Sequence, residues 1–237
     1  MKRNKELRAA ARQALSGHWG WAILPGLIVG AITSVFMLPS IFTNSLSSTI
    51  TSLGDPAALG AFLAASMLGS TISTFGGIFA TNPLSVGYNN TLKQLYKDSD
   101  LKTVPNLFKF GFTEGRYWRN VLGMFLVGLF TFLWTLLFII PGIIKGYAYS
   151  LTSYILVDNP ELSPNEARLK SIEMMRGHKW KLFGLDLSFI GWFLLCILSL
   201  GIGLIWIEPY WLTSRAAFYR NLVEELNPQP AAEPVAE

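Results

Sequence analysis

A long uncharged apolar segment near the C-terminus constrains this chain more than any other feature. Residues 187–207 contain no charged side chain, and they follow a basic, aromatic start, RGHKWK, at 176–181. A helix of about 20 apolar residues crosses roughly 30 Å of bilayer hydrocarbon. Glu208-Pro209 closes the run, and we expect the chain to turn there. The segment therefore predicts a membrane-spanning helix.

Other apolar runs repeat this pattern, at 21–41, 59–86 and 121–140, with a shorter one at 143–157 and a less apolar return at 210–226. Only 14% of the residues are charged, whereas soluble domains usually carry about 25%. We therefore predict an all-α fold. It is a polytopic membrane helical bundle of about six transmembrane helices, arranged as three hairpins with amphipathic surface helices.

Prolines and loop-forming residues set the expected ends of these spans. Pro25 and Pro39 should bend or end the first span, because proline removes a helical hydrogen bond. The stretch at 43–58 is rich in Ser, Thr and Gly and lacks Lys and Arg, so we expect a non-cytoplasmic loop there. Pro141-Gly142 should turn the second hairpin, and one long kinked helix is the alternative.

The basic residues predict the orientation of the spans. Five of the nineteen Lys and Arg residues precede the first span, six lie within 93–119, and five lie within 158–181. With six spans, these sixteen residues share one face, and positive charge favours the cytoplasmic face. We therefore expect both termini in the cytoplasm. The net charge of +4 indicates an anionic membrane face and not a nucleic-acid partner.

Three short segments beside the spans predict surface helices. At 4–16 the apolar residues fall on one face and the basic residues elsewhere, which suits a helix lying on the membrane. The aromatic and basic segment PNLFKFGF at 105–112 suits an interfacial helix. The sequence SPNE at 163–166 predicts a capped helix start, in which the serine caps and the glutamate completes the capping box.

Small residues recur at every fourth position of the second span and form one ridge on a helix: Ala61, Ala65, Gly69, Ser73, Gly77 and Thr81. In lipid, such a ridge lets two helices approach closely, so it predicts a tight helix–helix seam. The alternative is the lining of a polar pore, for which the span supplies the hydroxyls of Ser66, Ser70, Thr71, Ser73 and Thr74. Such hydroxyls also bond back to their own helix and are weak evidence for a pore.

A threefold internal repeat is our interpretation of the whole pattern. Three helix-start motifs precede spans: SGHWGW at 16–21, EGRYW at 114–118 and RGHKW at 176–180. They divide a single transmembrane domain, 1–226, into copies at 4–97, 103–157 and 163–226. Repeated membrane units can frame a central site, and they also occur in purely structural bundles. The Pro-, Ala- and Glu-rich segment 227–237 predicts a disordered tail.

The C-terminal half resembles a known family. Within 138–203, the sequence IIPGIIKGYAYSLTSYILVDNPELSPNEARLKSIEMMRGHKWKLFGLDLSFIGWFLLCILSLGIG resembles the domain of unknown function 975, a family of predicted bacterial integral membrane proteins. The segment LRAAARQAL at 7–15 resembles the start of that family, so the resemblance extends over nearly the whole chain. It implies a bacterial plasma-membrane location. The family has no established activity, so the resemblance implies no catalytic residue and no substrate.

Asp186 is the leading candidate for an intramembrane polar site. It lies about one turn inside the fifth span, where an ionisable residue is a functional hypothesis by default. Its possible partners are Lys145 and Arg215, which follow the prolines of the second and third copies. A structural or interfacial role, a buried ion pair, and a proton or substrate site are the alternatives for Asp186. Snorkelling to the lipid headgroups is the simplest role for the two cations.

A second set of candidates lies in the helix-start motifs, where side chains would meet the lipid interface. The set comprises His18, Trp19, Arg116, His178, Lys179, Trp180 and Lys181. Interfacial anchoring is the simpler role, since tryptophan and basic residues concentrate at that depth. Recognition of a headgroup phosphate by His178 with the two neighbouring lysines is the sharper alternative.

The sequence lacks the signatures of several other functions. Cys196 is the only cysteine, so no intrachain disulfide or zinc cluster is expected. The two histidines do not have metal-ligand spacing. No P-loop, dinucleotide fingerprint or G-x-S-x-G motif occurs. We therefore expect no enzymatic activity, no metal and no cofactor.

Two functions remain as hypotheses. The first is a non-enzymatic membrane scaffold or interaction protein, which contacts membrane lipids through its basic face and binds protein partners or itself. The alternative is a transporter or exporter of a small solute or lipid, with a site between the repeats near Asp186. A polar cavity within the membrane would favour the transporter, whereas a dry, closely packed interior would favour the scaffold.

Overall fold

The computed structural model describes residues 2–53, 55–98, 102–113 and 115–227, and within these ranges all regular structure is helical. The prediction of an all-α fold is confirmed. All of the predicted tail except Asn227 lies outside the described residues. The helices are α1 (Asn4–Leu15), α2 (Trp19–Leu53), α3 (Pro56–Gly76), the π-helical turn η1 (Gly77–Thr81), α4 (Asn82–Asp98), α5 (Thr103–Phe112), α6 (Tyr117–Leu137), α7 (Ile139–Tyr149), α8 (Thr152–Asp158), α9 (Pro164–Met174), α10 (Lys179–Leu187), α11 (Ile190–Leu198) and α12 (Leu204–Leu226).

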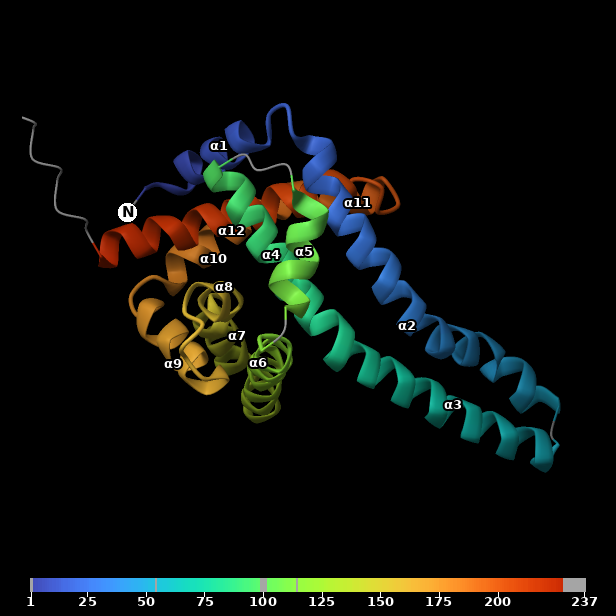
Figure 1. The fold of residues 1–237 in the computed structure, drawn as a ribbon. Coiled ribbons are helices and arrows are strands. Elements are labelled where there is room, and N and C mark those ends of the chain that lie inside the picture. Colours follow the sequence, from blue (N-terminus) through green and yellow to red (C-terminus); the bar gives the residue numbers. More distant parts are fainter. Residues whose placement is uncertain (1, 54, 99–101, 114, 228–237) are drawn as a thin grey trace, which may run out of the picture.

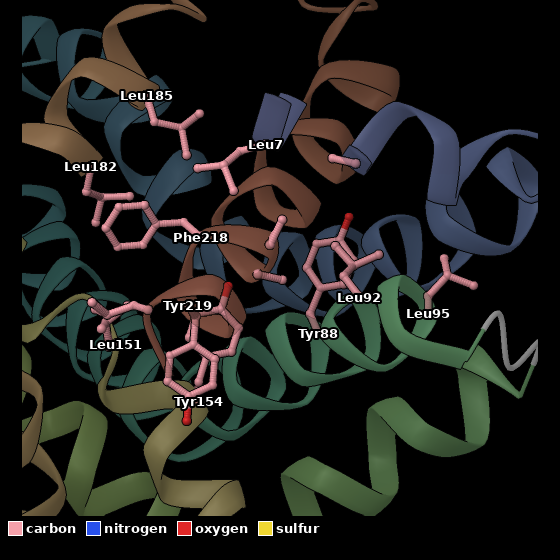
Figure 2. Packing of buried hydrophobic residues seen from close by; sticks show 14 of the residues in the cluster. Leu7, Tyr88, Leu92, Leu95, Leu151, Tyr154, Leu182, Leu185, Phe218 and Tyr219 are labelled. Carbon is pink, nitrogen blue, oxygen red and sulfur yellow. The ribbon is translucent and has the colours of Figure 1, made fainter. Parts of the chain in front are cut away.

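The helices form a packed body from which α2 and α3 project together (Figure 1). In the body, α12 packs on α1, α2 and α4, and α8 packs on α4, α6 and α9. The two ends of the described chain meet there, since the Lys2 backbone N–H donates to the Asn221 side-chain oxygen at 2.8 Å. Figure 2 shows the core, to which α1, α4, α8, α10 and α12 contribute residues such as Leu7, Leu92, Tyr154, Leu182 and Phe218.

Four segments of this fold are long and apolar enough to cross a membrane. They are Trp19–Thr43, Pro56–Lys97, Tyr117–Leu137 and Lys179–Leu198. The return helices α7, α8 and α12 do not meet that criterion. A membrane protein is therefore indicated, while the six spans and their arrangement as three hairpins stay predictions.

The uncharged run 187–207 does not form one helix, contrary to our expectation. It is divided between the end of α10, α11 and the start of α12, and the chain reverses at Leu200 and Gly201, which have φ of 53° and 87°. The Gly201 N–H donates to the Cys196 carbonyl at 2.8 Å, which satisfies the end of α11. The predicted turn at Glu208-Pro209 is wrong, because Pro209 lies inside α12.

Other expected helix ends also moved. The predicted loop at 43–58 is wrong over most of its length, because α2 continues to Leu53 and α3 begins at Pro56. The first hydroxyls of this segment donate to backbone carbonyls one turn earlier in α2. Thr43 Oγ1, for example, donates to the Pro39 carbonyl at 3.1 Å. Neither Pro25 nor Pro39 ends α2. The turn expected at Pro141-Gly142 lies earlier, at Phe138, between α6 and α7, and these two helices pack on each other.

Two residues of the small-residue ridge, Gly69 and Ser73, face α2. A Cβ atom added at Gly69 would lie 3.4 Å from Pro39, and one added at Gly76 would collide with Phe36. Ser73 donates to the Phe36 carbonyl at 2.7 Å, across the same seam. Among the remaining hydroxyls, those of Ser70, Thr71 and Thr74 donate to carbonyls four residues back in α3. This arrangement supports a packed seam between α2 and α3.

The three surface helices pack on the protein, and they include the segment 4–16, which we expected to lie on the membrane. The apolar stripe of α1, formed by Leu7, Ala11 and Leu15, is fully buried. α1 packs on α12, α5 packs on α4, and α9 packs on α8. Each surface helix therefore covers one of the returning helices α4, α8 and α12, each of which follows an apolar segment. α1 covers α12, the last helix of the chain.

The three helix-start motifs share one backbone conformation. Gly17, Gly115 and Gly177 have φ of 80°, 77° and 83°, in the left-handed region that favours glycine. The residue after each glycine donates its N–H to the carbonyl three residues earlier, at 2.9, 3.0 and 3.1 Å. The glycine in each motif thus ends one helix and lets the next begin at once.

Close contact between α4 and α5 depends on glycine, and it predicts a sharp effect of mutation. A Cβ atom at Gly87 would collide with the Leu107 carbonyl, and one at Gly111 would lie 2.7 Å from the Pro83 carbonyl. We expect Gly87→Ala to lower the free energy of unfolding by about 1–3 kcal/mol, because backbone must shift. Thermal unfolding in detergent, followed by circular dichroism, measures this.

The matched control is Gly128→Ala in α6, where an added Cβ meets no atom within 4 Å. That change should be neutral or stabilising, since alanine is the better helix former. Equal unfolding temperatures for Gly87→Ala and the unmodified protein would contradict the proposed close packing.

The start of α9 predicts a pH effect. The expected capping box is confirmed: the Ser163 N–H donates to Glu166 Oε2 at 2.8 Å, and the Glu166 N–H donates to Ser163 Oγ at 3.3 Å. Hydrogen bonds from Ser163 hold the pKa of Glu166 below its ordinary value of 4.5. The ionised carboxylate therefore stabilises the folded state above pH 4.5, and this contribution is lost as the pH falls through the folded-state pKa.

We expect hydrogen-exchange protection of the first turn of α9 to fall as the pH drops below 4.5. Glu166→Gln keeps an acceptor oxygen but cannot titrate, so its protection should stay level over the same range. Protection that falls equally in both proteins would show that another group carries the effect.

Candidate functional site

Asp186 on α10 is held by two side chains of α12. Its Oδ1 accepts a hydrogen bond from the Trp211 indole N–H at 2.7 Å and lies 3.7 Å from Arg215 Nε. The Arg215 guanidinium in turn lies 4.9 Å from the centre of the Trp211 ring. The side chains of Asp186 and Arg215 are 17% and 22% exposed. The two charges therefore form a mostly buried pair that joins α10 to α12.

This pair forms one wall of a pocket of about 330 Å³, and pockets of roughly 300–1,000 Å³ accommodate small ligands. α6 and α7 supply the other walls, with hydroxyls from α6 and small residues from α7. The Gly142 backbone lies so close to Thr135 that an added Cβ would collide with it. The lining residues are Thr131, Thr135, Gly142, Ile143, Gly146, Tyr147, Asp186 and Arg215.

Lys145, the third member of the predicted intramembrane site, lies elsewhere. Its ammonium is 4.7 Å from the centre of the Trp134 ring, a cation–π contact between α7 and α6. It forms no ion pair with Asp186. The structure thus brings together two of the three residues, Asp186 and Arg215, and separates the third.

The predicted interfacial residues do not form one site, because they belong to three separate helix starts. Trp19 is partly buried and meets the Tyr210 ring edge-on at 6.5 Å. Trp180 is 80% exposed, which suits contact with lipid. His18, Arg116, His178, Lys179 and Lys181 are all partly exposed. His18 and Trp19 are neighbours in the first motif, and residues 178–181 are consecutive in the third.

Sequence reasoning missed Trp211, which binds Asp186, and the other residues that line the pocket, such as Tyr147, Thr131 and Thr135. A signal for Trp211 was present, because it lies four residues before Arg215 and shares a helix face with it. No comparable signal marked Thr131, which reaches the pocket only because α6 packs on α7. Among the described residues, no group of three or more His, Cys, Asp and Glu side chains could hold a metal ion.

The Asp186–Arg215 pair predicts coupled effects of mutation. Asp186→Asn leaves the Arg215 cation without its counter-charge, and Arg215→Gln leaves the carboxylate with hydrogen bonds from Trp211 and Tyr147 but no cation. We expect each change to lower the free energy of unfolding by about 1–3 kcal/mol, because an unpaired buried charge is costly. The double variant should lose less than the sum of the single losses.

Thermal unfolding of the four proteins in detergent measures this coupling, and Glu173→Gln on the exposed face of α9 is the control. Strictly additive losses would show that the two charges do not interact.

Comparisons with known proteins locate the chain in a family. A search of curated proteins and a search of solved structures each found no match. The N-terminal segment 7–15, which also resembles the family in sequence, lies outside the matched region. Residues 114–226, which include Asp186, Arg215 and the whole lining of their pocket, match the model described as Protein of unknown function (DUF975), so this segment belongs to that family.

Proposed function

We propose that this protein is a multi-pass protein of the bacterial plasma membrane that binds a small zwitterionic solute beside Asp186 and Arg215 and passes it across the membrane. The observation that carries this proposal is the pocket itself, because a carboxylate and a guanidinium share one wall of it. A polar pocket next to apolar segments that suit a bilayer favours a transporter over a scaffold with a dry interior.

The geometry of the pair explains why the ligand should carry both charges. Arg215 Nε lies 3.7 Å from the Asp186 carboxylate, whereas closed ion pairs of this kind are about 2.7–2.9 Å long. The pair is therefore close enough for mutual attraction but leaves donors and acceptors open to a ligand. A zwitterion can replace both partners at once, since its cation meets Asp186 and its anion meets Arg215.

The proposed orientation follows from the positive charges. The surface helices and helix starts carry most of the Lys and Arg residues, and such charge favours the cytoplasmic side. We therefore propose that both termini are cytoplasmic. We also propose that the three helix-start motifs mark three repeats, at 4–97, 103–157 and 163–226. Their common glycine conformation supports this division, and sites in transporters often lie between repeats.

A non-enzymatic scaffold is the second candidate, and a specific observation favours it. α2 and α3 project from the body and expose large apolar side chains such as Phe42, Met67 and Leu68. Such a surface would contact membrane lipids, a protein partner or a second copy of the chain. Under this alternative the Asp186–Arg215 pair would only fasten α10 to α12.

Water access to the pocket distinguishes the two candidates. Single cysteines are introduced into a Cys196→Ala background at Thr135, which lines the pocket, and at Leu136, which is 73% exposed on the outside of the same helix. The proteins are placed in lipid nanodiscs and treated with a charged methanethiosulfonate reagent. We expect rapid modification of Thr135→Cys and little of Leu136→Cys, because lipid shields the outer position from a charged reagent.

Uptake of radiolabelled zwitterionic amino acids into proteoliposomes then tests transport, with Asp186→Asn as the variant expected to abolish it. Equal, slow modification of both cysteines would overturn the solute pocket and leave the scaffold. Rapid modification of Thr135→Cys with uptake that Asp186→Asn does not change would overturn the role of the charged pair.

A further inference from the structure

A second charged cluster lies where α4, α8 and α12 meet, and none of its residues lines the Asp186 pocket. The Lys93 ammonium contacts Asp158 Oδ1, and the Tyr219 hydroxyl donates to Asp158 Oδ2 at 2.8 Å. The rings of Tyr154 and Tyr219 stack at 4.9 Å, as Figure 2 shows, and the Lys93 ammonium lies within 6.0 Å of both ring centres. One helix from each proposed repeat contributes to the cluster.

The cluster forms the floor of a pocket of about 340 Å³ between α4, α5, α8 and α12. Its lining residues are Lys93, Gln94, Lys97, Phe110, Val157, Asp158, Tyr219, Arg220, Val223 and Glu224. None of these residues lines the Asp186 pocket. The site is therefore separate from the proposed solute site, and its existence does not depend on transport.

Some of the charged groups at this pocket have a partner of opposite charge, and Arg220 does not. Both oxygens of Asp158 are already occupied, by Lys93 and by Tyr219, so this carboxylate has little capacity for a further cation. Arg220 follows Tyr219 in α12 and lines the same pocket. It forms no hydrogen bond or ion pair with the described residues. Glu224 is the other lining carboxylate, and it is exposed. A partly buried guanidinium therefore faces the pocket without a fixed counter-charge.

An anion with several acceptor oxygens fits this arrangement. A guanidinium presents paired donors that match a phosphate, and an ammonium adds a further donor. The apolar side chains of Phe110, Val157 and Val223 flank these cations and would contact the organic part of the ligand. We propose that the pocket binds a phosphate-bearing ligand through Arg220 and Lys93, either a soluble organic phosphate or the headgroup of an anionic phospholipid.

Titration of the full-length protein in detergent with inorganic phosphate, followed by calorimetry, tests the shared chemistry. Arg220→Gln should weaken binding about tenfold or more, because a charged hydrogen bond is lost. Glu224→Gln should strengthen binding, because a competing carboxylate one helical turn away is removed. Arg176→Gln, an exposed cation beyond the pocket lining, should leave affinity unchanged. Thermal unfolding confirms that each variant folds.

A second arm distinguishes the two sources of phosphate. The protein is taken from nanodiscs that contain phosphatidylglycerol, and native mass spectrometry measures the lipid it retains. Phosphate binding that Arg220→Gln weakens supports a soluble ligand, whereas retained lipid that Arg220→Gln loses, without phosphate binding, supports a headgroup. Absence of both, or equal binding by Arg220→Gln and the unmodified protein, would overturn the proposal.

Discussion

The packing of each short surface helix on a returning helix is the interaction on which the rest of this structure depends. α5 covers α4, α9 covers α8, and α1 covers α12, so the first helix of the chain packs on the last. Burial of the apolar stripe of α1 drives its association with α12, whereas α9 buries a mixed face of Ala167, Arg168 and Ser171. Because α1 joins α12, the chain closes on itself, and the three returning helices are held around one centre.

That centre explains where the charged groups are found. α4, α8 and α12 each carry polar side chains toward their common contact, and these side chains satisfy one another: Asn90 donates to the Ser153 carbonyl at 2.8 Å, and Tyr219 donates to Asp158. Buried polar groups need such partners, because an unpaired donor or acceptor in a dry interior is costly. Pairing of this kind fixes the register between the helices. The Asp186–Arg215 pair likewise fixes the register between α10 and α12.

The two proposed sites differ in the way their charges are paired. At Asp186 the opposite charges are adjacent but not in closed contact, so a ligand with both charges competes with the pair. At Arg220 the cation has no fixed partner, so a ligand with negative charge completes it. Each pocket also lies between helices from different proposed repeats.

The sequence by itself determined the helical class, the apolar segments and the local signals at helix starts. The SPNE capping box and the glycines at 17, 115 and 177 act through neighbours a few residues away, so they are visible without tertiary information. The sequence also singled out Asp186 and Arg215, which pair in the structure, because charge beside apolar segments is conspicuous. Only the tertiary structure decided the remaining features. The amphipathic stripe of α1 fits lipid and protein equally well, and only the position of α12 shows that protein covers it. The chain reverses at Leu200 and Gly201 and not at Pro209, which lies inside α12, a helix held by its packing on α1, α2 and α4. Lys93, Asp158 and Arg220 lie far apart in the sequence, so their common pocket exists only once α4, α8 and α12 have packed together.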